Sequence, residues 1–152
     1  MSTAKRATNS RAEKMAEKHV ADLQDAGLRI TPQRIAILRV LAEAEDHPDV
    51  AEIHQRVQGD DPKISIATAY RTVAALEQAG MIHRHTFEGA SARFERVNKK
   101  HHDHIVDLDT GEIVEFHSDL IEQLQADIAA ALGYELVHHR LELYCRKRPQ
   151  TP

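Results

Sequence analysis

The chain has 152 residues, of which 41% are apolar, and a formal net charge of −4. No apolar run approaches the roughly 20 residues of a membrane-spanning helix, and the first residues lack the apolar core of a secretory signal. The single cysteine, Cys145, excludes an intramolecular disulfide and a zinc site made only of cysteines. We therefore expect a cytoplasmic protein without a membrane partner.

The excess of acidic residues lies wholly in residues 97–152, so the preceding part is neutral overall and can still present a basic face. Apolar spacing and terminus signals predict four helices in that first part. They are one over residues 11–26, one that begins at Pro32 with Thr31 as its N-cap, one capped by Asp49 and one capped by Ser65.

After the fourth helix the apolar pattern changes to a period of two. Residues 81–87 and 92–97 flank a turn-rich segment and predict a β-hairpin. Helices followed by a two-stranded hairpin are the order of a winged helix-turn-helix, whose last helix enters the DNA major groove. On that helix Tyr70 and Arg71 lie off the apolar stripe and can contact bases or phosphates. The alternative is that Tyr70 packs in the core and Arg71 is a solvated surface charge.

The second part begins after a short polar hinge at residues 98–100. Residues 104–116 predict two strands around a turn, and residues 118–133 predict a helix whose start resembles a capping box of Asp119 and Glu122. Residues 134–145 predict a last strand that carries His139 on an otherwise apolar face. Because three strands and one helix cannot bury both faces of a sheet, we expect this part to pair with a second copy.

Three histidines and an aspartate stand together at residues 101–104. Side chains alternate along a strand, so His102 and His104 point one way while His101 and Asp103 point the other, which suits two metal sites on opposite faces. Imidazole and carboxylate ligands without thiolates suit Fe²⁺, Mn²⁺, Zn²⁺ or Co²⁺. For the other histidines we favour solvated or hydrogen-bonded side chains, namely His19, His54, His83, His117 and His138; His139 alone could be a hydrogen-bonded core histidine.

Several segments together resemble the ferric uptake regulator (Fur) family of metal-responsive repressors. They are "GLRITPQRIAIL", "ISIATAYRTVAALEQAGMI", "FEGASARFE", "HHDHIVDL", "IVEF" and "HHRLELY". The resemblance implies an α+β chain: a winged-helix DNA-binding domain over residues 1–97 with an N-terminal helical extension, a hinge at 98–100, and a small C-terminal α/β metal-binding dimerisation domain over 101–148. It implies no enzymatic activity.

The resemblance also implies two ligand sets and a DNA-contacting set. The regulatory hinge site would consist of His47, Glu95, His102, His104 and Glu115. The second site would consist of His101, Asp103, Glu122 and His139. DNA would be contacted by Tyr70 and Arg71 in the major groove and by Arg29 in the minor groove. The partition of residues 101–104 agrees with the alternation argument.

One departure from the family is plain in the sequence. Many members hold a structural zinc with two Cys-x-x-Cys pairs, but the first pair's positions here are Asp107 and Thr110, and after Tyr144 there is only Cys145. We therefore expect no four-cysteine zinc.

The function implied is a metal-dependent repressor of metal-homeostasis genes. It would bind a palindromic double-stranded operator as a homodimer, or a higher oligomer, when loaded with Fe²⁺ or Mn²⁺, with Zn²⁺ at one site or in vitro. The alternative is a non-haem metalloenzyme with His102, His104 and Glu115 as a two-His-one-carboxylate centre. A metal-independent winged-helix repressor is a third reading.

Overall fold

A computed structural model describes residues 3–97 and 100–150, with side-chain surroundings from residue 11 onward. The chain divides into two compact units, Met1–Asn98 and Lys99–Pro152. Of the predicted hinge, residues 98 and 99 lie outside the described part. No helix in the described ranges is both long enough and apolar enough to cross a membrane.

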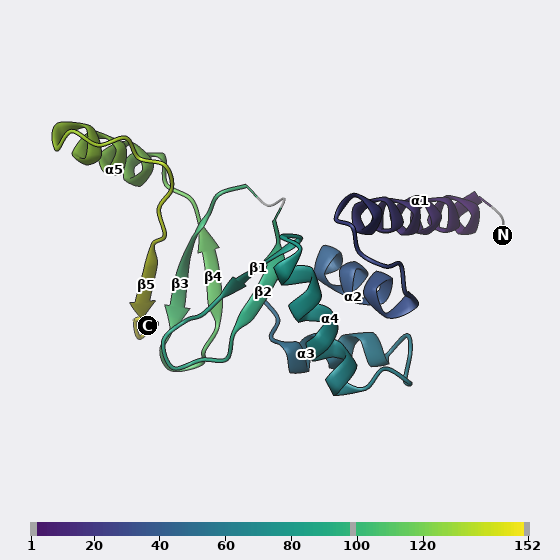
Figure 1. The fold of residues 1–152 in the computed structure, drawn as a ribbon. Coiled ribbons are helices and arrows are strands. Elements are labelled where there is room, and N and C mark those ends of the chain that lie inside the picture. Colours follow the sequence, from purple (N-terminus) through teal and green to yellow (C-terminus); the bar gives the residue numbers. More distant parts are fainter. Residues whose placement is uncertain (1–2, 98–99, 151–152) are drawn as a thin grey trace. The chain divides into compact units, whose positions relative to one another are not determined.

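The first unit contains four helices and a hairpin (Figure 1). They are α1 (Thr3–Asp25), α2 (Pro32–Glu43), α3 (Val50–Gln58), α4 (Ile66–Gln78), β1 (Ile82–His85) and β2 (Arg93–Arg96). The predicted starts of α2, α3 and α4 are confirmed, because Thr31, Asp49 and Ser65 each accept a hydrogen bond from the backbone N–H three residues on. Helix α1 begins earlier than predicted, since residues 3–10 contain no glycine or proline to stop it.

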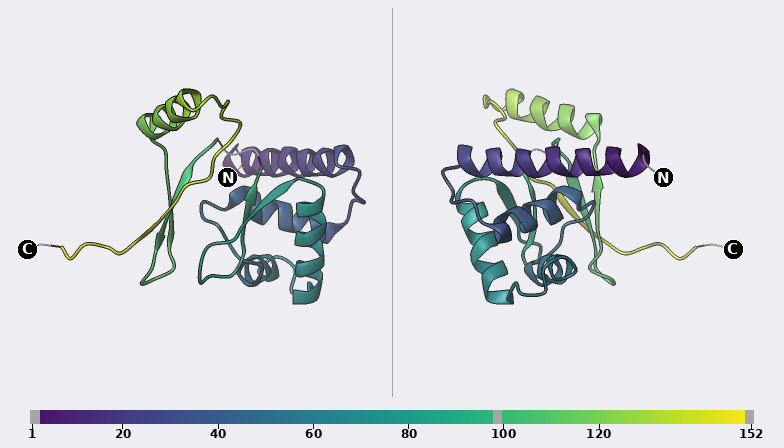
Figure 2. Two further views of the ribbon diagram at one scale, coloured as in Figure 1. Left: turned by 60° about the vertical axis from the view of Figure 1, so that its left-hand side comes forward. Right: turned by 90° about the vertical axis from the view of Figure 1, so that its right-hand side faces the viewer.

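The core of the first unit lies between α2, α3 and α4. Its buried side chains include Leu38, Ile53 and Leu76 from the helices, and Ile82 and Phe94 from the antiparallel pair β1–β2. Helix α1 lies against α2 and contributes Leu23 (Figure 2). The unit thus has the helices and hairpin of the predicted winged helix.

The second unit contains β3 (Asp103–Asp107), β4 (Ile113–Phe116), α5 (Asp119–Ala131) and β5 (Glu142–Cys145). The strand order is β4-β3-β5, with β4 antiparallel and β5 parallel to β3. His104 faces Glu115 on β4 and Glu142 on β5. The central strand β3 is therefore held on both sides, and it carries two of the predicted metal ligands, Asp103 and His104.

Two local predictions in the second unit are wrong. The N-cap of α5 is Ser118, whose side chain accepts from the Ile121 N–H, and not Asp119. The last strand spans only Glu142–Cys145, so His139 lies in an extended segment and not on a strand face. The reason is the length of β3. It begins at Asp103, and the pairing with β5 therefore begins near Leu141, whose carbonyl accepts from the His104 N–H at 3.2 Å.

Candidate metal centres

His47 lies in the loop between α2 and α3, and this loop is held against strand β2. The Phe94 N–H donates to the Pro48 carbonyl at 3.0 Å, and the Arg93 guanidinium donates to the His47 carbonyl at 2.9 Å. Both bonds are accepted by backbone carbonyls, so they fix the position of the loop. The orientation of the His47 ring depends instead on the contacts of its side chain. Sequence reasoning assigned no role to Arg93.

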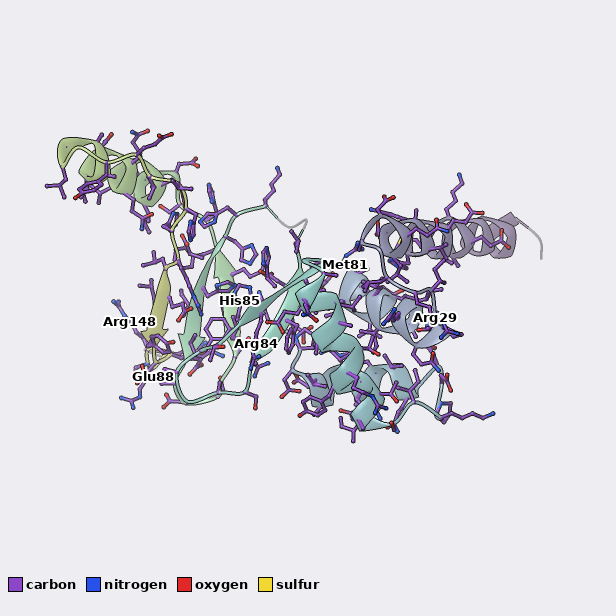
Figure 3. The ribbon with its side chains drawn as sticks, in the orientation of Figure 1. Arg29, Met81, Arg84, His85, Glu88 and Arg148 are labelled. Atoms are coloured by element: carbon purple, nitrogen blue, oxygen red, sulfur yellow. The ribbon has the colours of Figure 1, made fainter. Side chains whose placement is uncertain are left out.

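The Glu95 carboxylate lies between two imidazoles of the first unit. Its Oε2 is 3.1 Å from His47 Nε2, and its Oε1 is 2.6 Å from His85 Nε2. Both His47 and Glu95 are buried. His85 lies on β1 (Figure 3) and was missed by sequence reasoning. The signal was present, because in the β1–β2 register His83, His85 and Glu95 share one face of the hairpin.

His102, His104 and Glu115 come together within the second unit. The two imidazole rings are 4.8 Å apart between centroids, and His102 Nε2 is 3.6 Å from Glu115 Oε1. His102 Nδ1 is 2.8 Å from the Lys100 carbonyl, which can only accept, so Nδ1 carries the proton. That tautomer leaves on Nε2 the lone pair that a metal requires. The five residues predicted for the hinge site are thus organised as two residues in the first unit and three in the second.

The second predicted ligand set lies wholly within the second unit. Its four residues, His101, Asp103, Glu122 and His139, can each place one ligand atom within 4.8 Å of the others. Asp103 Oδ1 is 3.4 Å from His101 Nε2 and 3.2 Å from His139 Nε2, and Glu122 Oε1 is 3.3 and 3.4 Å from the same nitrogens. Two nitrogens and two carboxylate oxygens converge, which suits a divalent cation.

The buried carboxylate of Asp103 tests whether this set fits an ion. Asp103 is 1% exposed, and its Oδ2 has no hydrogen-bond partner in the described ranges. A buried carboxylate is costly unless it is paired, and imidazoles alone satisfy only one of its oxygens. The set therefore fits a cation. Glu122 joins this cluster from the first turn of α5, whose N-cap is Ser118. His139 joins it from the segment before β5.

The positions of the missing cysteine pair form a hydrogen-bonded turn between β3 and β4. Asp107 Oδ1 accepts from the Asp109 N–H at 2.9 Å and from the Thr110 N–H at 3.4 Å. These donors, chiefly the Asp109 amide, lower the pKa of Asp107. The Leu108 N–H donates to the Cys145 carbonyl at 2.8 Å. Backbone hydrogen bonds, rather than thiolates, join the turn to β5.

The residues predicted to contact DNA are all exposed. Tyr70 is 57% exposed on α4, which argues against the alternative that it packs in the core. Arg71 is exposed beside it, and its guanidinium lies 3.4 Å from Thr68 Oγ1. Arg29 lies in the loop before α2, where its carbonyl accepts from Arg34 at 2.6 Å (Figure 3).

One histidine differs from the expectation of a solvated or hydrogen-bonded side chain. His19 on α1 is 1% exposed, and neither ring nitrogen has a hydrogen-bond partner among the described residues. Burial, followed by the nearby Arg96 charge, lowers its pKa. His54 is hydrogen-bonded to the Ile64 carbonyl and His117 to Asp119, both as expected.

Comparison with known proteins gives concordant matches. The model of the ferric uptake regulator family matches residues 25–144. The ferric uptake regulation protein of Brucella suis biovar 1 is 56% identical over 126 residues, which cover 83% of this chain and 89% of that protein.

Two solved structures agree with this family match. The Vibrio cholerae ferric uptake regulator has a TM-score of 0.77 at 41% identity, covering 84% of this chain and 98% of that chain. A zinc-bound manganese uptake regulator has a TM-score of 0.73 at 47% identity, covering 90% and 98%. The chain therefore belongs to the ferric uptake regulator family, whose members are transcription regulators and not enzymes.

Proposed function

We propose that this regulator is a cytoplasmic, metal-dependent repressor of metal-homeostasis genes that binds palindromic operator DNA as a homodimer. Its relatives include proteins named for ferric or manganese uptake regulation, and related structures carry zinc, manganese or iron. The chemistry of the ligands agrees with that range, because imidazole and carboxylate donors without thiolates suit such divalent ions. Fe²⁺ and Mn²⁺ are the ions proposed in the cell, with Zn²⁺ at one site or in vitro.

The proposed regulatory site combines ligands from both units: His47 and Glu95 from the first, and His102, His104 and Glu115 from the second. The observation that carries the proposal is that each unit brings its own predicted ligands together. Glu95 is held between two imidazoles, and His102 has the tautomer that leaves Nε2 for coordination. A bound cation would supply the charge that holds both partial sets together.

The residues of the hinge site would thereby couple metal binding to DNA binding. Ligands from both units that share one ion would restrict the two winged domains of a dimer to one separation, as two successive half-sites require. Because binding free energies are linked, operator DNA must tighten metal binding by the factor by which metal tightens DNA binding. The domain limits proposed remain residues 1–97 and 101–148.

The second set, His101, Asp103, Glu122 and His139, would hold another ion inside the dimerisation domain. The homodimer would form through α5, whose Leu120, Leu124 and Ile128 are exposed on one side of the helix. On DNA, Tyr70 and Arg71 would read the major groove and Arg29 the minor groove, because all three side chains are exposed on the winged-helix unit. The metalloenzyme alternative is not favoured, since it leaves the winged helix without a role.

An electrophoretic mobility shift tests the proposal directly. The chain is freed of metal with a chelator, the chelator is removed, and the chain is then mixed with operator DNA with or without Fe²⁺, Mn²⁺ or Zn²⁺ under anaerobic conditions. We expect metal-dependent retardation in the wild type, its loss in His102→Ala, and its retention in the matched control His117→Ala, an exposed histidine of the same unit. Equal retardation with and without metal would contradict metal control. Normal retardation by His102→Ala would contradict the hinge-site assignment.

A further inference from the structure

The histidine that sequence reasoning passed over makes the shortest contact of the Glu95 carboxylate. His85 Nε2 is 2.6 Å from Glu95 Oε1. A carboxylate can only accept, so His85 Nε2 carries the proton and donates it. A nitrogen that donates a proton to Glu95 has no lone pair to give an ion. At 2.6 Å this contact is shorter than the 3.1 Å between His47 Nε2 and Glu95 Oε2, so His85 is assigned as the hydrogen-bond donor of Glu95 and His47 as the ligand.

The His85 ring is fixed by the side chains on either side of it. It stacks on Phe87 with 5.9 Å between ring centroids and 15° between ring planes. Two further rings meet it edge to face: the His47 ring at 5.7 Å and 85°, and the more distant His83 ring at 6.5 Å and 62°. Phe87 is itself buried. Because these ring contacts restrict rotation, the Nε2–H stays directed at Glu95 Oε1.

The two oxygens of Glu95 consequently have different neighbours. Oε1 accepts from His85, and Oε2 faces His47, the other predicted ligand of the first unit. We propose that His85 is a positioning residue of the regulatory site: it occupies Oε1, orients the Glu95 carboxylate, and makes it bind a divalent ion through Oε2 alone. This inference rests on the proposed function, in which Glu95 is a ligand. Partners of metal-bound side chains commonly set ligand orientation, and their loss lowers affinity by about tenfold to a hundredfold.

The hairpin supplies a matched control for this role. His83 is directly opposite Glu95 in the β1–β2 register and shares its face, yet it is exposed, and in the described part of the chain it forms no hydrogen bond with that carboxylate. The residue directly opposite Glu95, His83, is therefore not the one that bonds to it. The bond comes from His85, the diagonal neighbour of Glu95. Removing His83 takes away one imidazole from the same face and leaves the Glu95–His85 bond in place.

The test is a titration of chelated, full-length protein with Co²⁺ and with Mn²⁺, followed by the visible absorption of the Co²⁺ form. The variants are His85→Ala, His85→Gln, His83→Ala and Glu95→Ala. Gln places an amide donor where Nε2 stands, so it restores the bond to Oε1. Thermal unfolding of each metal-free variant identifies any that fails to fold, and His85→Gln carries the test if His85→Ala fails.

We expect His85→Ala to weaken metal binding by about tenfold to a hundredfold and to change the Co²⁺ spectrum as Glu95 gains a second bonding oxygen. We expect His85→Gln to stay within about threefold of the wild type with an unchanged spectrum, and His83→Ala to behave as wild type. Wild-type affinity in His85→Ala, together with a loss in Glu95→Ala, would overturn this inference alone. An equal loss in His85→Ala and His85→Gln with a shifted spectrum would make His85 a ligand and also overturn it. Wild-type affinity in Glu95→Ala would instead overturn the proposed ligand set.

Discussion

The two units of the chain bury their apolar residues very differently. In the first unit, side chains from α1 to α4 and from the hairpin form one buried cluster. In the described part of the second unit, Val106 is the only buried apolar side chain, and α5 buries none of its residues. A sheet with one unpacked helix is not expected to be stable alone. The first unit therefore has a core of its own, whereas the second needs a partner surface.

The predicted metal ligands of the two units also differ in how much apolar core lies beneath them. His47 and Glu95 belong to a loop and a hairpin that are already packed on a core. His104 and Asp103 belong to a strand whose sheet has almost no core beneath it. Ions and a second copy would add to the second unit the stability that apolar packing supplies to the first. Four experiments can sharpen or break this contrast.

The largest effect is expected from placing charge on the exposed face of α5. Leu124→Asp combined with Ile128→Asp should abolish the dimer and weaken operator binding by about a hundredfold or more, because two carboxylates from each protomer would have to be buried in the interface. Ala126→Asp, on the opposite side of α5, is the control. Light scattering after size-exclusion chromatography reports the oligomer, and a dimer of unchanged affinity would show that α5 is not the interface.

Metal removal should affect stability less than loss of the interface. At a free metal concentration of 100 times Kd, a bound ion contributes about 2.7 kcal/mol, which chelation takes away. We expect the chelated protein to stay folded and dimeric, since the β3–β4 turn is closed by hydrogen bonds of Asp107 and not by thiolates. Circular dichroism with size-exclusion chromatography checks it, and conversion to unfolded monomer would make a metal structural.

A substitution in the first unit should leave the second unit unaffected. Arg71→Ala should weaken operator binding by about 1–3 kcal/mol if the guanidinium contacts a base edge. Metal affinity without DNA and the dimer should stay as in the wild type. Arg146→Ala, an exposed arginine of the second unit, controls for the loss of one positive charge. Unchanged operator affinity in Arg71→Ala would remove this residue from the interface.

The smallest effect concerns the buried His19 of the first unit. Its pKa in the folded state is lowered by burial and by Arg96, so the folded protein binds fewer protons there than the unfolded chain. The protein therefore keeps its full free energy of unfolding, as far as His19 is concerned, above the unfolded-state pKa of about 6.5. That free energy falls as the pH drops below this value. His19→Leu should stabilise the fold by about 1 kcal/mol at neutral pH and reduce the loss on acidification.

Urea unfolding of the chelated wild type and variant at about pH 7.5 and pH 5.5 measures this difference, since histidines titrate between these values. His138→Gln, at an exposed histidine, is the control. An unchanged pH dependence in His19→Leu would mean that His19 titrates alike in both states.

Sequence reasoning succeeded where the determinant is local. Thr31, Asp49 and Ser65 begin their helices through bonds to backbone three residues away, so the sequence alone contains both partners. At α5 two adjacent good caps compete, and the pattern could not tell Ser118 from Asp119. The split of residues 101–104 between two ligand sets was argued from strand alternation, but only Asp103 and His104 of them lie in β3, and the ligand sets stay a prediction.

The failures depend on partners far along the chain. The start of β5 depends on the start of β3, about forty residues earlier. The sequence of residues 134–145 alone therefore does not predict where β5 begins. The role of His85 depends on the hairpin register, which sets the residues opposite and diagonal to Glu95. The burial of His19 depends on how α1 lies on α2. Such facts follow from packing between elements, whereas periodicity describes one element at a time.

Alternation at β3 has a consequence for how the length of this chain can change. In the proposed assignment His104 belongs to one ligand set and Asp103 to the other. Each has its partner two residues earlier, His102 at 4.8 Å between ring centroids and His101 at 3.4 Å. Inserting or deleting one residue within this run would turn the side chains on one side of the change to the opposite face. Both ligand sets would then lose members in a single event. A change of length in the hairpin turn at residues 88–91 would act differently, because it would shift the β1–β2 register that places His85 diagonal to Glu95.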